Sequence, residues 1–249
     1  MNPELLDNRN TGWSPRTQAR AAGIFYLINI VTGIFAIIFV RAALVVPGDA
    51  AATAANILAH EMRFRLGFAA EIVTCLTNIP LAILFYNLFR VVNRNLALAD
   101  VFLNLVGTAI EAAVLLSHFA PLIILHGEGH FSAFTSEQLH AQVYMSLQLQ
   151  DVGLSIALVF FGFDILVTAC LIWKSTFLPK AIGVLLAIEG VGYLINSFAF
   201  FLAPALQARI FPYFTITGIG EISLCLWLIV MGVNVARWEQ RASAAGVHP

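Results

Sequence analysis

Residues 21–46 read AAGIFYLINIVTGIFAIIFVRAALVV, and the only charged side chain in this apolar run is Arg41. The hydrocarbon core of a bilayer is crossed by a helix of about 20 apolar residues, which satisfies its own backbone hydrogen bonds there. The run does not alternate between apolar and polar residues, as the strands of a membrane barrel do. It therefore predicts a transmembrane helix.

Five further runs of this kind follow, so we predict an all-α polytopic membrane protein built as a bundle of six transmembrane helices. The predicted spans are residues 21–46, 66–89, 96–125, 149–173, 181–203 and 213–236. A cytoplasmic N-terminal segment (1–20) precedes this six-span membrane domain (21–236), and a cytoplasmic tail (237–249) follows it. The inner connections are short and the chain contains no linker, so no second domain is expected.

The composition of all 249 residues agrees with a membrane location. Hydrophobic residues make up 60% and charged residues 11% of the chain, whereas soluble domains contain about 25% charged residues. The net charge of -1 argues against a nucleic-acid partner. The three cysteines all lie in apolar runs, so a disulfide framework is not expected.

The distribution of Lys and Arg predicts that both termini face the cytoplasm, because cytoplasmic loops carry an excess of basic residues. With the N-terminus inside, the inner segments hold nine of them: Arg9, Arg16, Arg20, Arg90, Arg94, Lys174, Lys180, Arg237 and Arg241. The outer segments hold the other four: Arg41, Arg63, Arg65 and Arg209.

Local motifs predict where several helices begin. Asp49 follows a Pro-Gly step and can cap a short Ala-rich helix in the first outer loop. Thr135 with Gln138 fits a capping box, so the fourth helix should begin near Ser136, before the membrane. Pro179 is suited to start the fifth helix.

Five carboxylates lie well inside the predicted spans: Glu71, Glu111, Asp164, Glu189 and Glu221. Each ionisable residue at a helix centre costs about 2.5–3.5 kcal/mol on insertion scales, so five unpaired ones would cost roughly 12–18 kcal/mol. Because no Lys or Arg lies mid-span to neutralise them, we expect these side chains to face the bundle interior. There they would be protonated, paired with arginines near the outer margin, or occupied by a cation.

Their expected depths suggest a polar path through the bundle. Glu71 and Glu221 fall in the outer third as a gate, and Glu189 falls in the inner third. Glu111 and Asp164 are central, and His118 lies seven residues beyond Glu111 on the same helix face. Amides at intermediate depths extend the path: Asn29, Asn78, Asn104 and Asn196. Asp100 and Asp151 are placed at span margins, within reach of water.

Structural interpretations stand beside these. Glu71 can form an outer salt-bridge cluster with Arg41, Arg63 and Arg65, and Glu221 can pair with Arg209. His118 alone is typical of a hydrogen bond between helices, and asparagines commonly hold neighbouring helices together, at about 0.6–2 kcal/mol each.

Several segments resemble a bacterial membrane-protein family. They are VTGIFAIIFV, VVPGDAAATAANILA, FRLGF, VNRNLALAD, LVFFGF and FLPKAIGVLL, spread from about residue 20 to the fifth span. The family is catalogued as a domain of unknown function, number 4386. The resemblance implies a multi-pass protein of the bacterial inner (plasma) membrane, and it assigns no catalytic residue.

Three hypotheses for function follow. The leading one is binding or transport of a proton, a small cation or a small polar solute through the acid-lined bundle, with no cofactor evident and only the lipid bilayer and that ligand as partners. The binding residues would be Glu111, His118, Asp164, Glu189, Asn196, Glu71 and Glu221.

An alternative is a metal-dependent lipid hydrolase that uses Glu111, His118 and Asp164, with the spacing of His126 and His130 as a second, weaker metal signal. The other is a non-catalytic accessory or sensor protein, whose polar residues only pack helices and whose partner surface is the loop of residues 127–148. The sequence favours a function other than catalysis, and it leaves the oligomeric state open.

Overall fold

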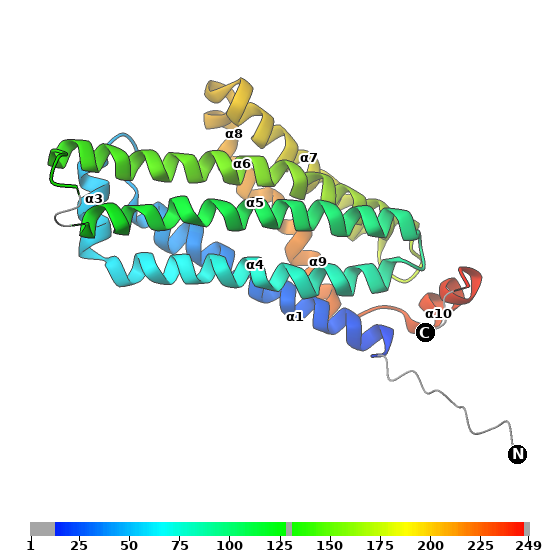
Figure 1. The fold of residues 1–249 in the computed structure, drawn as a ribbon. Coiled ribbons are helices and arrows are strands. Elements are labelled where there is room, and N and C mark those ends of the chain that lie inside the picture. The colour runs from blue at the N-terminus through cyan, green and yellow to red at the C-terminus, as the bar shows by residue number, and fades with distance from the viewer. Residues whose placement is uncertain (1–12, 128–130, 247–249) are drawn as a thin grey trace, which may run out of the picture.

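The computed structural model describes residues 13–127 and 131–246, apart from the side chains of residues 211–217. The described residues form helices and no strand (Figure 1). The long helices are α1 (Pro15–Ile34), α4 (Glu61–Phe89), α5 (Arg94–His126), α6 (Ser136–Lys174) and α7 (Lys180–Leu202). The all-helical membrane fold predicted from the apolar runs is confirmed.

Among the described residues, five helical segments are long and apolar enough to cross a membrane: Pro15–Leu44, α4, α5, α6 and α7. A sixth span requires α9 (Ile219–Val230) to be counted together with α10 (Val235–Ala244), across a bend of 100°. Helix α9 is apolar, whereas α10 carries two arginines and a glutamate. We therefore treat α9 as the membrane-embedded part of this pair.

The sixth apolar segment is not one continuous helix over residues 213–236, as the sequence predicts. Helix α8 (Pro204–Thr217) begins directly after α7, because Pro204 starts a new helix where Ala203 has left helical geometry. Gly218 separates α8 from α9, and α9 ends before Gly232, whose φ of 68° lies in the left-handed region.

The first span begins earlier than residue 21 because Ser14 caps α1 and Pro15 occupies its first turn. Beyond Ile34 the chain forms a π-helix, η2 (Phe35–Arg41), and then one α-helical turn, α2 (Ala42–Leu44). A π-helical stretch changes the direction in which the following side chains point. In this protein it ends at Arg41, the charged residue of the span.

The six helices form a closed ring. Helix α1 packs against α4, α4 against α5, α5 against α6 and α6 against α7, and α9 closes the ring by packing against both α7 and α1. The last contact is close: a Cβ on Gly23 of α1 would come within 2.9 Å of the Ile229 backbone nitrogen. Short loops explain why consecutive helices are neighbours.

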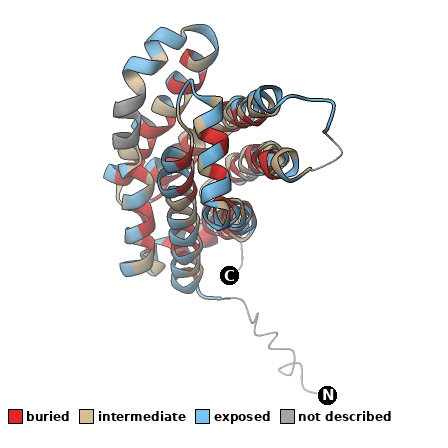
Figure 2. Cartoon of the chain, turned by 90° about the vertical axis from the view of Figure 1, so that its left-hand side faces the viewer, coloured by how far each residue is buried: buried red, intermediate tan, exposed pale blue. Residues whose placement is uncertain are grey.

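Buried residues line the faces where the helices meet, and exposed residues lie on the outside of the bundle (Figure 2). Gln150, Glu189 and Ser197 are fully buried, whereas Leu116, Leu202 and many other large apolar side chains are exposed. Soluble monomers rarely expose such extensive apolar surface. The outer surface is therefore suited to contact with lipid.

The predicted helix starts are confirmed. The Asp49 side chain accepts a hydrogen bond from the Ala52 backbone nitrogen and caps α3 (Ala50–Ala59). Thr135 and Gln138 form both bonds of the capping box at the start of α6. Pro179 occupies the N-cap position of α7.

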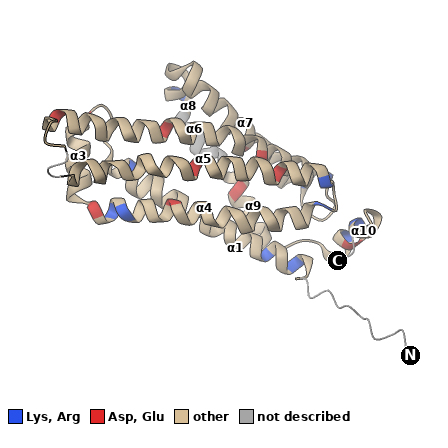
Figure 3. Ribbon diagram, viewed as in Figure 1, with Lys and Arg blue, Asp and Glu red and all other residues tan. Residues whose placement is uncertain are grey.

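Helix α10 packs against the end of the bundle at which α1 begins. Many Lys and Arg residues lie at this end (Figure 3). Trp238 donates from its indole nitrogen to the carbonyl of Leu88, at 3.0 Å. Arg237 and Arg241 donate to the carbonyls of Thr176 and Lys174, at 3.0 and 2.9 Å. The residues predicted as a cytoplasmic tail thus include a helix packed on the loops.

Candidate functional site

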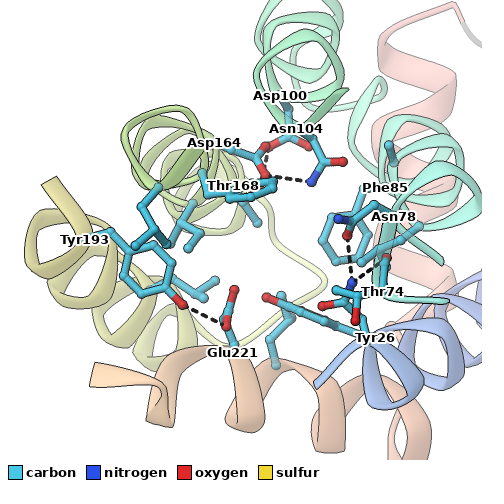
Figure 4. A pocket seen from close by; sticks show the side chains of 18 of the residues that line it. Tyr26, Thr74, Asn78, Phe85, Asp100, Asn104, Asp164, Thr168, Tyr193 and Glu221 are labelled. Carbon is cyan, nitrogen blue, oxygen red and sulfur yellow. Dashed lines mark hydrogen bonds between the residues drawn. The ribbon is translucent and has the colours of Figure 1, made fainter. Parts of the chain in front are cut away.

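The ring of helices encloses a cavity of about 210 Å³, which is lined by side chains from all six ring helices (Figure 4). A water molecule in the liquid takes about 30 Å³, so the space can hold several waters or one small solute. Four carboxyl groups line it: Asp100, Glu111, Asp164 and Glu221. Among the twenty described residues that form its wall, none is Lys, Arg or His.

One wall of the cavity is a pair of aspartates. Asp100 accepts a hydrogen bond of 2.5 Å from the Thr168 hydroxyl, and Asp164 Oδ2 accepts one of 3.0 Å from Asn104 Nδ2. The carboxyl groups of Asp100 and Asp164 also interact directly with each other. Two carboxylates in contact repel strongly in a low-dielectric interior, so a proton or a cation must neutralise this pair.

Helix periodicity explains why these residues meet. Asp100, Asn104 and Glu111 are separated by four and seven residues on α5, and Asp164 and Thr168 by four on α6, so each set lies on one helix face. Helices α5 and α6 pack side by side, which brings the two faces together.

The opposite wall is Glu221 between two tyrosines. The Tyr193 hydroxyl donates to Glu221 Oε2 at 3.3 Å, and the Tyr26 hydroxyl also interacts with this carboxyl group (Figure 4). Phenol donors stabilise the charged form of a carboxylate. The sequence places Glu221 at an outer gate with Glu71, but the structure places it on this wall because α8 takes up the first part of the sixth apolar segment.

A third wall consists of amides and hydroxyls. Asn29 Nδ2 donates to Asn78 Oδ1 and to the Thr74 carbonyl, both at 3.0 Å, and Asn78 Nδ2 donates to Thr108 at 3.0 Å. These bonds join α1 to α4 and α4 to α5. Both asparagines therefore hold helices together, as the structural interpretation of the sequence suggests, while they also border the cavity.

Glu189 lies behind the cavity and not on its wall. Its Oε2 accepts the backbone N–H of Glu221 at 2.8 Å, so this carboxylate caps the first turn of α9, where the helix dipole favours a negative charge. Gly220 makes the approach possible, because a Cβ there would come within 2.5 Å of Glu189 Oε2. Buried Glu189 Oε1 has no hydrogen-bond partner among the described residues.

A second polar group lies toward α3, and we call it the α3-end cluster: Arg41, Glu71, His118, Gln150 and Asp151. Arg41 bonds Asp151 at 2.6 Å and Gln150 Oε1 at 2.9 Å. Gln150 Nε2 donates to Glu71 at 3.1 Å, and His118 Nδ1 lies 2.8 Å from Glu71. The cluster joins η2, α4, α5 and α6, and the π-helical turn presents Arg41 to it.

The arginine partners considered for Glu71 and Glu221 are not those in the structure. Arg65 pairs with Glu61 at 2.6 Å, and Arg41 reaches Glu71 only through Gln150. Glu221 bonds Tyr193 rather than Arg209. The bundle thus encloses the acids of the spans. Neither Glu71 nor Glu221 pairs directly with the arginines that the sequence suggested for it.

The candidate metal ligands Glu111, His118 and Asp164 do not form one site. His118 bonds Glu71, whereas Asp164 bonds Asn104, and no three His, Cys, Asp or Glu side chains in the described part of the chain are placed to hold a metal ion. The geometry gives no support to the hydrolase alternative. His126 pairs with Glu61 at 3.1 Å, while His130 lies outside the described residues.

The remaining predicted residue, Asn196, is buried away from the cavity and accepts a hydrogen bond of 3.4 Å from Gln207. In turn, the sequence analysis missed Asp100 as a site residue, which is only 3% exposed and not at a wet margin. Its spacing of four residues from Asn104 was the available signal. No comparable spacing in the sequence indicated that Tyr26 and Tyr193 would lie beside Glu221.

Comparison with known proteins identifies the family of the chain. A family model described as a domain of unknown function (DUF4386) matches residues 21–232, so the chain belongs to this family. The chain is also similar to an uncharacterized protein of Archaeoglobus fulgidus, with 29% identity over 79 residues. That match covers 32% of this chain and 46% of the relative, so about half of the relative's length is matched. No solved structure matches the chain.

Proposed function

We propose that this member of the DUF4386 family binds a proton, a small cation or a small polar solute in its acid-lined cavity and moves it across the membrane. One observation carries the proposal: four carboxyl groups face an interior space whose described wall contains no basic residue. Uncompensated carboxylates in a low-dielectric interior are costly, so a positive charge must be supplied from outside the wall.

The connection of the cavity to the α3-end cluster supports movement as well as binding. Cys75 of α4 lies one turn from Glu71, and its side chain interacts with Glu111, which lines the cavity. Glu71 in turn bonds His118 and Gln150. Groups that can carry or exchange a proton therefore extend from the cavity toward the α3 end of the bundle.

We further propose that the protein lies in the inner membrane with both termini in the cytoplasm. The support is the excess of Lys and Arg in the segments at the end of the bundle where α1 begins. By sequence, these segments hold nine of the thirteen Lys and Arg residues. With this orientation the α3-end cluster is the outer end of the path.

The non-catalytic accessory alternative would be favoured if every buried acid were fully hydrogen-bonded. Instead, Asp164 Oδ1 and Glu189 Oε1 are buried with no partner among the described residues. Burying such an acceptor without a donor costs about 1–3 kcal/mol.

The test is flux in proteoliposomes that contain a pH-sensitive dye and carry an imposed Na⁺, K⁺ or H⁺ gradient. Wild-type protein should dissipate at least one of these gradients, and Asp164→Asn and Glu111→Gln should each abolish the flux. The matched control is Glu137→Gln, which neutralises an exposed acid at the start of the same helix as Asp164 and should leave the flux unchanged. Wild-type rates in both cavity variants would refute the proposal.

A further inference from the structure

Two residues of the cavity wall, Asn104 and Asp164, each carry a buried hydrogen-bond acceptor without a donor among the described residues. Asp164 Oδ1 and Asn104 Oδ1 are buried, and no described group donates to either. The other polar atoms of these two side chains are joined by the 3.0 Å bond from Asn104 Nδ2 to Asp164 Oδ2, which fixes both side chains on the wall. The wall therefore matches a ligand that carries two or more hydrogen-bond donors.

The rest of the cavity is suited to hydrocarbon. Eleven of the twenty lining residues are aliphatic or aromatic, and they include Leu158, Leu186 and Leu224. A bare metal ion needs oxygen ligands on all sides at short distance. The aspartate pair and Glu221 instead lie on opposite walls, and no three His, Cys, Asp or Glu groups converge anywhere in the described chain.

Aromatic rings border the space between the acidic walls. Tyr26 stands edge-on to Phe85, with ring centroids 6.1 Å apart and planes at 81°, and Tyr193 lies on the other side of Glu221 (Figure 4). Aromatic faces attract organic ammonium ions by about 0.5–2 kcal/mol each. Positive charge, donor groups and hydrocarbon are thus all complementary to the wall.

We infer that the ligand of the cavity is a small protonated amine, primary or secondary, whose N–H groups donate to the carboxyl groups of the wall, Asp164 among them, while its hydrocarbon part lies against the leucines. This inference rests on the proposed function and names the ligand class for the same site. A primary or secondary ammonium supplies two or three donors, whereas a quaternary ammonium supplies none. The volume of about 210 Å³ limits the ligand to a few heavy atoms beyond the nitrogen.

The experiment measures binding of radiolabelled ethylamine to the purified full-length protein in detergent, at neutral pH where the amine is protonated. Competition by unlabelled ethylammonium, tetramethylammonium and sodium chloride at equal ionic strength defines the selectivity. We expect saturable binding that ethylammonium displaces at a concentration at least tenfold lower than the other two salts. Asp164→Asn and Asn104→Leu should each weaken binding at least tenfold, and Glu137→Gln should not.

The outcomes separate this inference from the proposed function. Equal competition by tetramethylammonium or Na⁺, still dependent on Asp164, would overturn the amine class and leave cation binding intact. No saturable binding of any of the three cations, together with no flux in proteoliposomes, would overturn both. If Asp164→Asn does not fold, the order of competition on wild-type protein and the Asn104→Leu variant still decide between these results.

Discussion

Replacing Gln150 by leucine removes the residue that connects the Arg41–Asp151 pair to the Glu71–His118 pair in the α3-end cluster. Gln150 is fully buried, accepts a hydrogen bond from Arg41 at 2.9 Å and donates to Glu71 at 3.1 Å. Leucine has a similar size but can make neither bond. The variant should therefore leave a half-buried guanidinium and a buried carboxylate each with one partner fewer.

The expected loss of stability can be worked out from these contacts. A hydrogen bond to a charged group contributes about 1.5–3 kcal/mol, so two of them give roughly 3–6 kcal/mol. Arg41 keeps Asp151, and Glu71 keeps His118, so we expect the lower end, about 3 kcal/mol. Hydrogen bonds between membrane helices average only about 0.6 kcal/mol, so two ordinary bonds would give roughly 1 kcal/mol.

The assay is equilibrium unfolding of the protein in mixed micelles with increasing mole fractions of a denaturing detergent, followed by circular dichroism. The control is Leu149→Ala at the neighbouring position, where the side chain is 52% exposed toward lipid and makes none of these bonds. We expect the control to change stability by less than about 1 kcal/mol. A Gln150→Leu variant as stable as this control would refute the view that the cluster is held by charge-assisted bonds.

Two further variants, Gly220→Ala and Trp238→Phe, test how α9 and α10 are held in place. Gly220→Ala should lower the free energy of unfolding by about 1.5–3 kcal/mol, because the new Cβ displaces the Glu189 carboxylate from the α9 backbone. Gly33→Ala, where nothing lies within 4 Å, should be neutral or slightly stabilising in the same unfolding assay, and equal losses in both would contradict the reasoning. Trp238→Phe should remove the bond to the Leu88 carbonyl and speed amide hydrogen exchange in α10, and unchanged exchange would show that α10 is held by other contacts.

The apolar runs predicted most of the fold because a bilayer sets both the length and the composition of a spanning helix. The positions of α4, α5, α6 and α7 agree with the predicted spans to within several residues at the α4–α5 and α6–α7 loops. Their ends were readable where side chains cap them, as at Asp49 and Thr135. Helix α6 starts well before its predicted span because the capping box, and not the membrane boundary, determines where it begins.

Sequence patterns could not predict other features of the fold, because these depend on contacts between distant segments. The sequence does not distinguish the π-helix at Phe35–Arg41 from an ordinary membrane helix, since all but its last residue are hydrophobic. The break at Gly218 is a single glycine in an apolar run, like several that do not break a helix. Both features decide which polar groups meet: one delivers Arg41 to Gln150, and the other brings Glu221 beside Glu189.

The sequence predicted that acidic residues would line the bundle interior, but it identified only some of the residues that line the cavity. Charge-burial arguments selected Glu111, Asp164 and Glu221, which do line the cavity. They grouped His118 with Glu111 from spacing on one helix, although His118 bonds Glu71 of the neighbouring helix. Asp100 was assigned to the membrane margin because its depth was judged from the start of the apolar run, yet its side chain faces inward across from Asp164.

The central claim is that an external positive charge neutralises the acids of the cavity, and infrared difference spectroscopy tests it most directly. Spectra of the purified protein are recorded with and without ethylammonium, Na⁺ or K⁺ at constant pH. A bound cation should replace protons, so that the carbonyl band of protonated carboxyl groups decreases as carboxylate bands increase, and Asp164→Asn should reduce this change. Spectra that no cation alters, or an identical change in wild-type and Asp164→Asn protein, would contradict the account.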